Sequence, residues 1–313
     1  MEKYTLSVLI AARNEEFLKN TVEDIIKNKR GKTEIIVGLD GQWAKPPLED
    51  HPDVTIYYSP TSLGQRGMLN QLCRLSKAKY VMKCDAHVAF DEGFDVKMID
   101  AFKETGDDVT MVPAMYTLHV FDWKCLKCGK RTYQGRTPLN CPDCDNTTKF
   151  ERRFCWQPRW HKRTEHWRFD SELHFQYWNA YKHRPEAKGD IIDTMSLVGA
   201  CWMLTRDKWW ELNICDEKHG SWGQQGTEVA CKSWLSGGRL VTNKRTWFAH
   251  LFRTQGGDFG FPYPNSQQAV NRAREYSKDF WFNNKFDKQT RPLKWLVEKF
   301  SPVPGWEDLS KLK

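Results

Sequence analysis

Two side chains with metal-binding chemistry follow a short, mostly apolar run. Residues 79–84 have the composition of a β-strand, and Asp85-Ala86-His87 comes directly after them. An α/β sheet usually places its chemistry at such strand ends. A carboxylate and an imidazole two residues apart lie on the same side and can hold one divalent cation, leaving other positions for phosphate oxygens. The pattern predicts a nucleoside-diphosphate site, although a histidine beside a strand is also common as a hydrogen-bonded structural group.

Size and composition describe an ordinary globular protein. The chain has 313 residues, of which 40% are hydrophobic and 28% are charged, enough to build a sizeable core. No apolar run approaches the roughly 18 residues of a membrane span. The first four residues lead straight into a predicted strand without a basic and apolar leader. We therefore expect a soluble protein of the cytoplasm, in a bacterial or phage-infected cell, with no membrane partner.

Four of the ten cysteines form two closely spaced pairs. Cys125-x-x-Cys128 and Cys141-x-x-Cys144 flank a short polar loop, which is the spacing of a zinc ribbon. Four thiolates close a tetrahedral shell and leave no open position, so we expect a structural Zn²⁺ that organises a small insert. The catalytic centre must lie elsewhere.

The remaining pattern alternates strands and helices. We expect strands over 5–12, 34–39, 54–58, 79–84 and 109–114, with helices at 18–26, 65–76 and 94–102 between them. This alternation predicts an α/β fold with a mostly parallel sheet. The regular pattern stops near residue 121 and resumes with a strand over 196–204 and a helix over 265–282.

We therefore divide the chain into three parts. Residues 1–120 form a predicted nucleotide-binding half. Residues 121–185 form an insertion containing the zinc ribbon and a segment rich in Arg, Trp and His. Residues 186–313 complete the fold with a glycine-rich segment over 254–264, which is either a mobile lid or an ordinary loop before the last helices.

Taken in order, the motifs resemble the GT-A glycosyltransferases of the family-2 type. The closest likeness is to the polypeptide N-acetylgalactosaminyltransferase branch. It covers most of the chain outside the insertion. The stretches that carry it are residues 8–15 with their Asn-Glu turn, Asp40-Gly41, Arg66, Asp85-Ala86-His87, residues 197–202, Trp222-Gly223, Glu228, Trp234, Gly237-Gly238 and His250.

The resemblance implies a metal-assisted reaction. Asp85, His87 and His250 would hold Mn²⁺, or Mg²⁺, against the diphosphate of a nucleotide-sugar donor, most plainly a UDP-sugar. Arg253 offers a planar fork for the same phosphates, unless it is a solvated surface residue. The donor-binding residues implied are Arg13, Asp40, Arg66, Asp85, Gly199, Trp222 and Arg253.

The stereochemical outcome depends on a general base. Inverting relatives carry a Glu-Asp pair where this chain has Gln225-Gly226, and neither of these residues can deprotonate an acceptor. We therefore expect retention, unless Glu228 serves as a substitute base. Glu228 is equally suited to bracing a helix.

The acceptor is inferred from charge. The chain has 48 Lys and Arg against 40 Asp and Glu, and the basic residues crowd the insertion, where they alternate with Trp156, Trp160 and Trp167. We expect a DNA acceptor, most plausibly a hydroxymethylated pyrimidine, as in phage-type DNA modification. Alternatives are a protein or glycan-precursor acceptor, or a non-catalytic zinc-ribbon protein that binds nucleic acid. The insertion could also simply buttress the donor site.

Overall fold

The computed structural model describes residues 3–220, 223–253, 259–310 and 312. Within this part of the chain, no helix combines the length and the apolar character that crossing a bilayer requires. The strands are β1 (Leu6–Ala12), β2 (Thr33–Asp40), β3 (Val54–Ser59), β4 (Tyr80–Cys84), β5 (Val88–Phe90), β6 (Val109–Cys125), β7 (Arg131–Tyr133), β8 (Phe150–Thr164), β9 (Trp167–Phe169), β10 (Phe175–Tyr177), β11 (Ile191–Asp193), β12 (Cys201–Thr205) and β13 (Arg239–His250).

Helices connect these strands and pack on the sheet. α2 packs on β1 and β2, while α3 packs on β6 and β13. The helices are α1 (Leu18–Asn28), α2 (Gly64–Leu75), α3 (Phe94–Thr105), α4 (Arg206–Glu211), α5 (Gln225–Leu235), α6 (Gln267–Phe282) and α7 (Leu293–Lys299), with 3-10 turns at Asn179–His183, Pro185–Ala187 and Glu217–His219.

The main sheet has the order β11-β13-β6-β12-β4-β1-β2-β3. β1 runs parallel to β2 and β4, β2 parallel to β3, and β13 parallel to β6, whereas β12 is antiparallel to its neighbours. Every residue of β4 and β12 is buried, as expected of strands covered on both faces. The predicted α/β fold with a mostly parallel sheet is confirmed.

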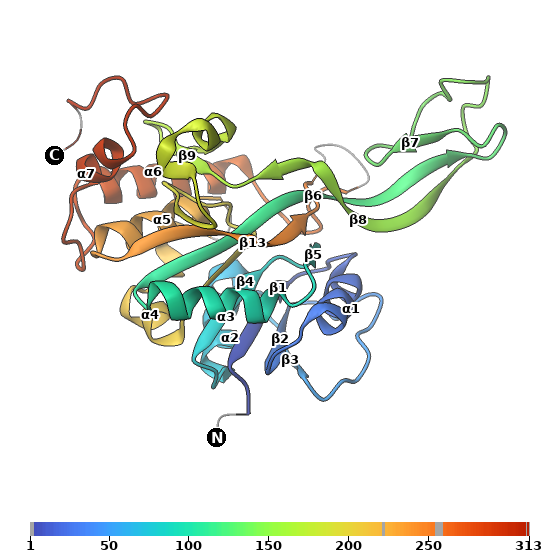
Figure 1. Cartoon of the computed structure of the whole chain (residues 1–313). Coiled ribbons are helices and arrows are strands. Elements are labelled where there is room, and N and C mark those ends of the chain that lie inside the picture. Colours follow the sequence, from blue (N-terminus) through green and yellow to red (C-terminus); the bar gives the residue numbers. More distant parts are fainter. Residues whose placement is uncertain (1–2, 221–222, 254–258, 311, 313) are drawn as a thin grey trace.

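A long hairpin extends the sheet away from the body (Figure 1). β6 continues for 17 residues from the core to Cys125, and the 15-residue β8 returns antiparallel to it. We call residues 121–165, which include β7, the arm. The sequence division at residue 121 therefore falls inside one continuous strand.

The strand β8 could not be recognised from its sequence pattern, for a physical reason. Its pairing with β6 shifts register twice, between Tyr116 and Thr117 and between His119 and Phe121. Each shift breaks the two-residue alternation of side chains. Most of β8 is also exposed or half-buried, so it lacks an apolar stripe.

The strand predicted over 196–204 begins only at Cys201. Ser196 forms a single bridge to Trp167, and residues 197–200 form a bend ahead of β12. The Asp85 backbone N–H donates to the carbonyl of Ala200 at 2.8 Å, which holds this bend against the end of β4. Gly199 is thereby brought beside Asp85 and His87 in one cavity.

Candidate functional site

Asp85, His87 and His250 come together at the end of the sheet. Asp85 follows β4, His87 precedes β5, and β5 pairs with the end of β13 so that Val88 lies opposite His250. The Nε2 atom of His250 lies 3.2 Å from Oδ2 of Asp85, and Nε2 of His87 lies 3.9 Å from the same oxygen. The ligand atoms of all three residues lie within 4.8 Å of one another.

This donor set fits a divalent cation. Two atoms that bind one ion at about 2.1 Å lie no more than about 4.2 Å apart, and both distances to Asp85 meet that limit. One carboxylate and two imidazoles suit Mn²⁺ and similar ions. Burial, followed by the nearby His87, lowers the pKa of His250 to about 4 despite its contact with Asp85, so His250 is neutral and can offer a lone pair.

Buried charged groups support the three ligands. Lys83, 1% exposed at its side chain, forms an ion pair with Asp85 and donates to the Gly199 carbonyl at 2.5 Å. Burial alone would raise the pKa of Asp85, but Lys83 and the contact with His250 outweigh it and hold that pKa well below its usual range. Asp85 is therefore an anion ready for a cation.

Glu15 links a metal ligand to an arginine. Its Oε2 lies 3.3 Å from Nδ1 of His87, and its Oε1 pairs with the guanidinium of Arg253. Burial would raise the pKa of Glu15, but His87 and Arg253 lower it. Oε2 of Glu15 and Nδ1 of His87 lie within ion-pair distance without the geometry of a hydrogen bond. With a metal bound, the carboxylate would orient Nε2 of His87 toward the ion through the remote ring nitrogen. Arg253 also donates to the Gly260 carbonyl at 2.8 Å and lies over the ring of Phe259.

A cavity of about 1070 Å³ opens above the metal ligands. It is large enough for a nucleotide sugar, since ligand pockets commonly measure about 300–1,000 Å³. The predicted donor residues that line it are Arg13, Asp40, Asp85, Gly199 and Arg253, together with His87 and His250. Trp222, another predicted donor residue, lies outside the described residues.

Asp40 shapes the wall of this cavity by capping a helix. Its Oδ1 accepts from the backbone N–H of Leu63 at 2.6 Å and its Oδ2 from Ser62 Oγ at 2.7 Å, at the start of α2. Arg13 donates to the same Ser62 hydroxyl at 3.1 Å. These bonds join the ends of β1 and β2 to the loop before α2 and form one polar corner of the cavity.

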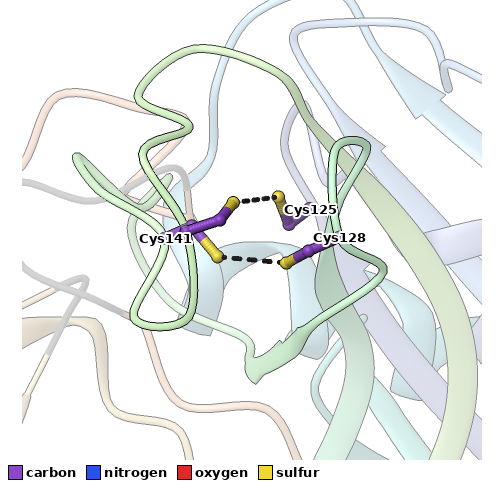
Figure 2. A group of neighbouring side chains, drawn as sticks. Cys125, Cys128 and Cys141 are labelled. Carbon is purple, nitrogen blue, oxygen red and sulfur yellow. Dashed lines mark hydrogen bonds between the residues drawn. The ribbon is translucent and has the colours of Figure 1, made fainter.

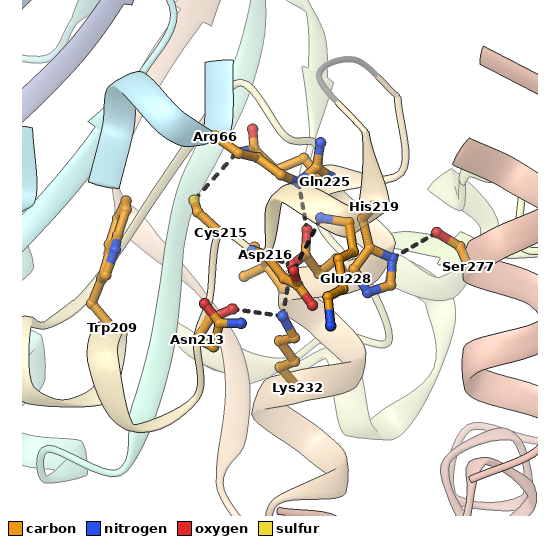
Figure 3. Close-up of polar contacts among 12 residues, drawn as sticks. Arg66, Trp209, Asn213, Cys215, Asp216, His219, Gln225, Glu228, Lys232 and Ser277 are labelled. Atoms are coloured by element: carbon orange, nitrogen blue, oxygen red, sulfur yellow. Dashed lines mark hydrogen bonds and ion pairs between the residues drawn. The ribbon is translucent and has the colours of Figure 1, made fainter. Parts of the chain in front are cut away.

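Arg66 and Glu228 are not placed as the sequence predicted. Their side chains are 1% and 0% exposed, and Nε of Arg66 donates to Oε2 of Glu228 at 2.8 Å. Lys232 holds the other oxygen at 2.7 Å (Figure 3). Neither residue lines the cavity. Both oxygens of Glu228 are engaged inside the protein, which argues against its role as a substitute base and for the alternative, that it braces α5.

Arg66 serves the same buried cluster. It donates to the backbone carbonyls of Gly220 and Gly223, which precede α5. Arg66 does not line the cavity, in contrast to its predicted contact with the donor. It holds the backbone before α5, and part of that backbone forms the cavity wall. Burial would raise the pKa of Glu228, but Lys232 and Arg66 lower it to about 2.

The position expected to hold a catalytic carboxylate is closely packed. Gln225 begins α5 and lines the cavity, while a Cβ placed on Gly226 would clash with the backbone carbonyl of Leu197. A Cβ on Gly199 would lie 3.4 Å from that of Gln225. The start of α5 thus rests directly on the bend over 197–200, and position 226 cannot present a side chain without movement.

The four paired cysteines meet near the outer end of the arm. The sulfur atoms of Cys125 and Cys144 lie 3.7 Å apart and those of Cys128 and Cys141 3.5 Å apart. Figure 2 shows the contact between the labelled residues Cys128 and Cys141. Ligands of a tetrahedral zinc site with Zn–S of about 2.3 Å lie about 3.8 Å apart, so the geometry fits this ion. Asn146 donates its side-chain amide to Cys125 Sγ at 3.2 Å.

Sequence reasoning assigned no role to Glu15, Lys83 or Phe259. Lys83 gave a signal, since it is the one charged residue among apolar ones just before Asp85. Glu15 lies in the Asn-Glu turn after β1, at a strand end. Phe259, whose ring lies 5.3 Å from that of His87, carried no recognisable signal in a glycine-rich segment.

Comparison with known proteins identifies the family. The profile described as "Glycosyl transferase family 2" matches residues 7–212, about two thirds of the chain. The chain belongs to glycosyl transferase family 2. A solved structure described as GalNAc-T7 with UDP, GalNAc and Mn²⁺ superposes with a TM-score of 0.62 at 16% identity, covering 90% of this chain and 49% of that one. This family 2 member therefore has the GT-A fold.

Two curated Drosophila melanogaster proteins also align with this family 2 chain. One is a putative polypeptide N-acetylgalactosaminyltransferase 13, 27% identical over 107 residues, or 34% of this chain. The other is N-acetylgalactosaminyltransferase 4, 26% identical over 106 residues, or 32% of this chain. The alignments span 19% and 16% of these relatives' own lengths. The likeness to the N-acetylgalactosaminyltransferase branch is confirmed.

Proposed function

We propose that this protein transfers a sugar from a nucleoside-diphosphate donor with the help of a divalent cation, Mn²⁺ or Mg²⁺. The observation that carries the proposal is the clustering of Asp85, His87 and His250 at the floor of a large cavity that Arg253 also lines. A cation bound there neutralises the charge that develops on the leaving diphosphate. Arg253 contributes a second positive contact to the same phosphates.

The donor we propose is a UDP-sugar with Mn²⁺. The support is the solved relative, which is described with UDP and Mn²⁺ and shares the fold over 90% of this chain. The polar corner formed by Arg13, Asp40 and Ser62 would receive the nucleotide end. The sugar would lie between the bend at Gly199 and the metal ligands.

The carboxylates that line the cavity support retention of configuration. The described residues that line the cavity include Glu15, Asp40 and Asp85, and each has another task. Glu15 is held by His87 and Arg253, Asp40 caps α2, and Asp85 is a metal ligand. An inverting transfer needs an additional carboxylate to take the acceptor proton, so a retaining transfer is supported.

The acceptor we propose is DNA, with a hydroxymethylated pyrimidine as the modified base. The support is the basic and aromatic arm described below, since nucleic acid is recognised by cationic and stacking side chains. A duplex base would have to be flipped out to reach the cavity. The cysteine cluster, with structural Zn²⁺, would organise the arm. Such a cluster needs reduced thiols, which supports a cytoplasmic location.

A protein acceptor is the second candidate. It is favoured by the aligned Drosophila relatives, one of which is described as a polypeptide N-acetylgalactosaminyltransferase. In that case the exposed aromatic residues of the arm would contact a peptide acceptor.

A donor assay tests the first part of the proposal. Purified protein is incubated with a panel of UDP-sugars, with and without Mn²⁺, and release of UDP is measured. Metal-dependent release that Asp85→Asn abolishes supports the proposal. Absence of release with every donor, together with absence of metal-dependent UDP binding, contradicts it.

An acceptor assay tests the second part. Labelled donor is offered to hydroxymethylated DNA, to unmodified DNA and to a Ser/Thr-rich peptide. Label in hydroxymethylated DNA alone supports the DNA acceptor. Label in the peptide alone establishes the second candidate in its place.

A further inference from the structure

The arm carries most of the chain's excess positive charge. Residues 121–165 contain 11 Lys and Arg against 5 Asp and Glu, a net charge of +6, whereas the whole chain has a net charge of +8. An excess this concentrated on one projecting hairpin creates a local field that attracts polyanions. Some basic side chains are paired, such as Lys130 with Asp143 at 3.0 Å. Among the described residues, Lys124, Lys149, Arg159 and Lys162 have no ion-pair partner.

Two large aromatic side chains are exposed on the same arm. Phe154 is 57% exposed and Trp160 is 62% exposed, the latter the most exposed tryptophan of the described chain. Phe154 stacks on Trp156 with ring centroids 5.8 Å apart and planes inclined by 14°. Trp160 stands edge-on against Tyr116 and Trp247 at 5.2 and 5.3 Å. Their neighbours hold both rings in place, so little side-chain entropy is lost when a flat ligand stacks on them.

The strand register shows which face of the arm these rings occupy. Phe154 lies opposite Phe121, and Arg152 lies opposite Trp123. Residues directly opposite in an antiparallel pair share a face. The Arg152 guanidinium lies 4.5 Å from the ring centre of Phe121. The register shifts leave Trp156 and Trp160 without a direct partner on β6. Trp156 is placed on the same side by its stacking on Phe154, and Trp160 by its contact with Tyr116, which belongs to the same buried cluster as Phe121. We call this side, which presents Arg152, Phe154, Trp156 and Trp160, the aromatic face of the arm.

The aromatic face adjoins the donor site. Arg152 pairs with Glu16 at 2.7 Å, next to Glu15 in the sequence. Trp156 donates from Nε1 to Asp24 of α1 at 3.0 Å and lies 6.1 Å from the ring of Phe17.

From Phe17, aromatic contacts continue to the metal ligands. The ring of Phe17 lies 5.4 Å from that of Phe259, which in turn lies 5.3 Å from that of His87. A polymer lying on the aromatic face would therefore be held near the mouth of the cavity.

We propose that the aromatic face of the arm is a binding surface for single-stranded nucleic acid, with bases stacking on Phe154 and Trp160 and phosphates contacting Lys162 and its basic neighbours. This inference rests on the proposed function, of which it specifies the acceptor surface. An acidic protein would use the charge but not the exposed rings. Nucleic acid uses both, because every base offers a flat face and every linkage a negative charge.

Fluorescence anisotropy with a labelled oligothymidylate tests this surface. The variants are Phe154→Ala, Trp160→Ala and Lys162→Glu. Their matched controls are Trp210→Ala, an exposed tryptophan on α4, and Lys294→Glu, an exposed lysine on α7. We expect each aromatic variant to weaken binding by about tenfold or more, as loss of one stacked base does. Lys162→Glu should weaken binding and flatten its salt dependence. The controls should bind as the unaltered protein does.

Two results would overturn the proposal. One is absence of oligothymidylate binding; the other is binding that polyglutamate competes away equally well and that Phe154→Ala and Trp160→Ala leave unchanged. Mn²⁺-dependent release of UDP is measured on the same preparations. If release persists while oligonucleotide binding is absent, the arm inference fails and the donor chemistry stands. If release is absent while binding depends on both rings, the donor proposal fails instead.

Discussion

At the scale of single residues, the proposed metal position is formed by three side chains from different strand ends. Removing one ligand leaves two, which should be insufficient to hold the ion. Removing a residue that only supports a metal ligand can lower metal affinity by up to about 100-fold. His250→Ala removes a ligand itself, so we expect Mn²⁺ affinity to fall by at least roughly 100-fold. Titration calorimetry on the purified protein measures this directly.

The matched control for that variant is His183→Ala. His183 is exposed and lies on a 3-10 turn away from the cavity. The His183→Ala variant should bind Mn²⁺ with the affinity of the unaltered protein. Equal affinity in the two variants would show that His250 is not a ligand.

Glu15 is expected to act through His87 and not by touching the ion. Glu15→Ala removes the carboxylate 3.3 Å from Nδ1 of His87, so the imidazole loses its fixed orientation. We expect Mn²⁺ affinity to fall by about tenfold or more. Glu15→Gln, which keeps an oxygen acceptor, should restore part of it.

Glu16→Ala is the control, because Glu16 pairs with Arg152 of the arm and not with a metal ligand. Unchanged Mn²⁺ affinity in Glu15→Ala would contradict the positioning role. A thermal unfolding curve recorded on the same sample reports the stability of the variant. A loss of Mn²⁺ affinity without a loss of stability therefore identifies the positioning role.

At the scale of elements, the buried cluster of Arg66, Glu228 and Lys232 fixes the start of α5. Removing Glu228 would leave two buried cations without their partner. We expect Glu228→Ala to lower the free energy of unfolding by about 3–5 kcal/mol. Denaturant unfolding measures this change, and Glu298→Ala, at a more exposed position on α7, is the control.

The same cluster predicts a pH dependence of stability. The pKa of Glu228 is about 2 in the folded protein, against a usual 4.5. A lowered pKa means that the stabilising charge is fully present above about pH 4.5 and is lost as the pH falls toward 2. Stability should therefore decline over that interval, and less steeply in Glu228→Gln. Identical acid profiles for the two proteins would contradict this account.

The arm is a second element whose integrity should depend on one ion. We expect one Zn²⁺ per chain by elemental analysis, and its loss in Cys141→Ser. Exchange of backbone amide hydrogens in residues 125–150 should then rise, while exchange in β1 and β4 stays unchanged. Cys155→Ser is the control. Full zinc content in Cys141→Ser would contradict the assignment of these four thiolates.

At the scale of the whole molecule, much of the fold could be read from the sequence. The buried strands β1, β2 and β4 and helices α1 to α3 have clear apolar periodicity, so they were predicted with small errors at their ends. The three candidate metal ligands could be named from the sequence because Asp85 and His87 end a strand and His250 matched a family motif, and the structure brings their ligand atoms together. The CxxC spacing predicted the clustering of Cys125, Cys128, Cys141 and Cys144, which the structure confirms.

The remaining features of the fold and the site depend on three-dimensional packing, which no local sequence pattern predicts. The arm strand β8 was missed because register shifts interrupt its alternation. Arg66 was predicted to bind the donor and Glu228 was given as a possible substitute base, yet these two residues, 162 positions apart in the sequence, form a buried ion pair. The tight approach of Gly226 to Leu197 likewise depends on how α5 packs on a distant bend.

One measurement tests the central claim most directly. A crystal of the protein with Mn²⁺ and UDP, with diffraction recorded at the manganese edge, locates the ion by its anomalous signal. We predict a peak bonded to Asp85, His87 and His250, with UDP diphosphate oxygens on its open side and Arg253 beside them. A manganese peak elsewhere, or UDP bound outside this cavity, would contradict the account.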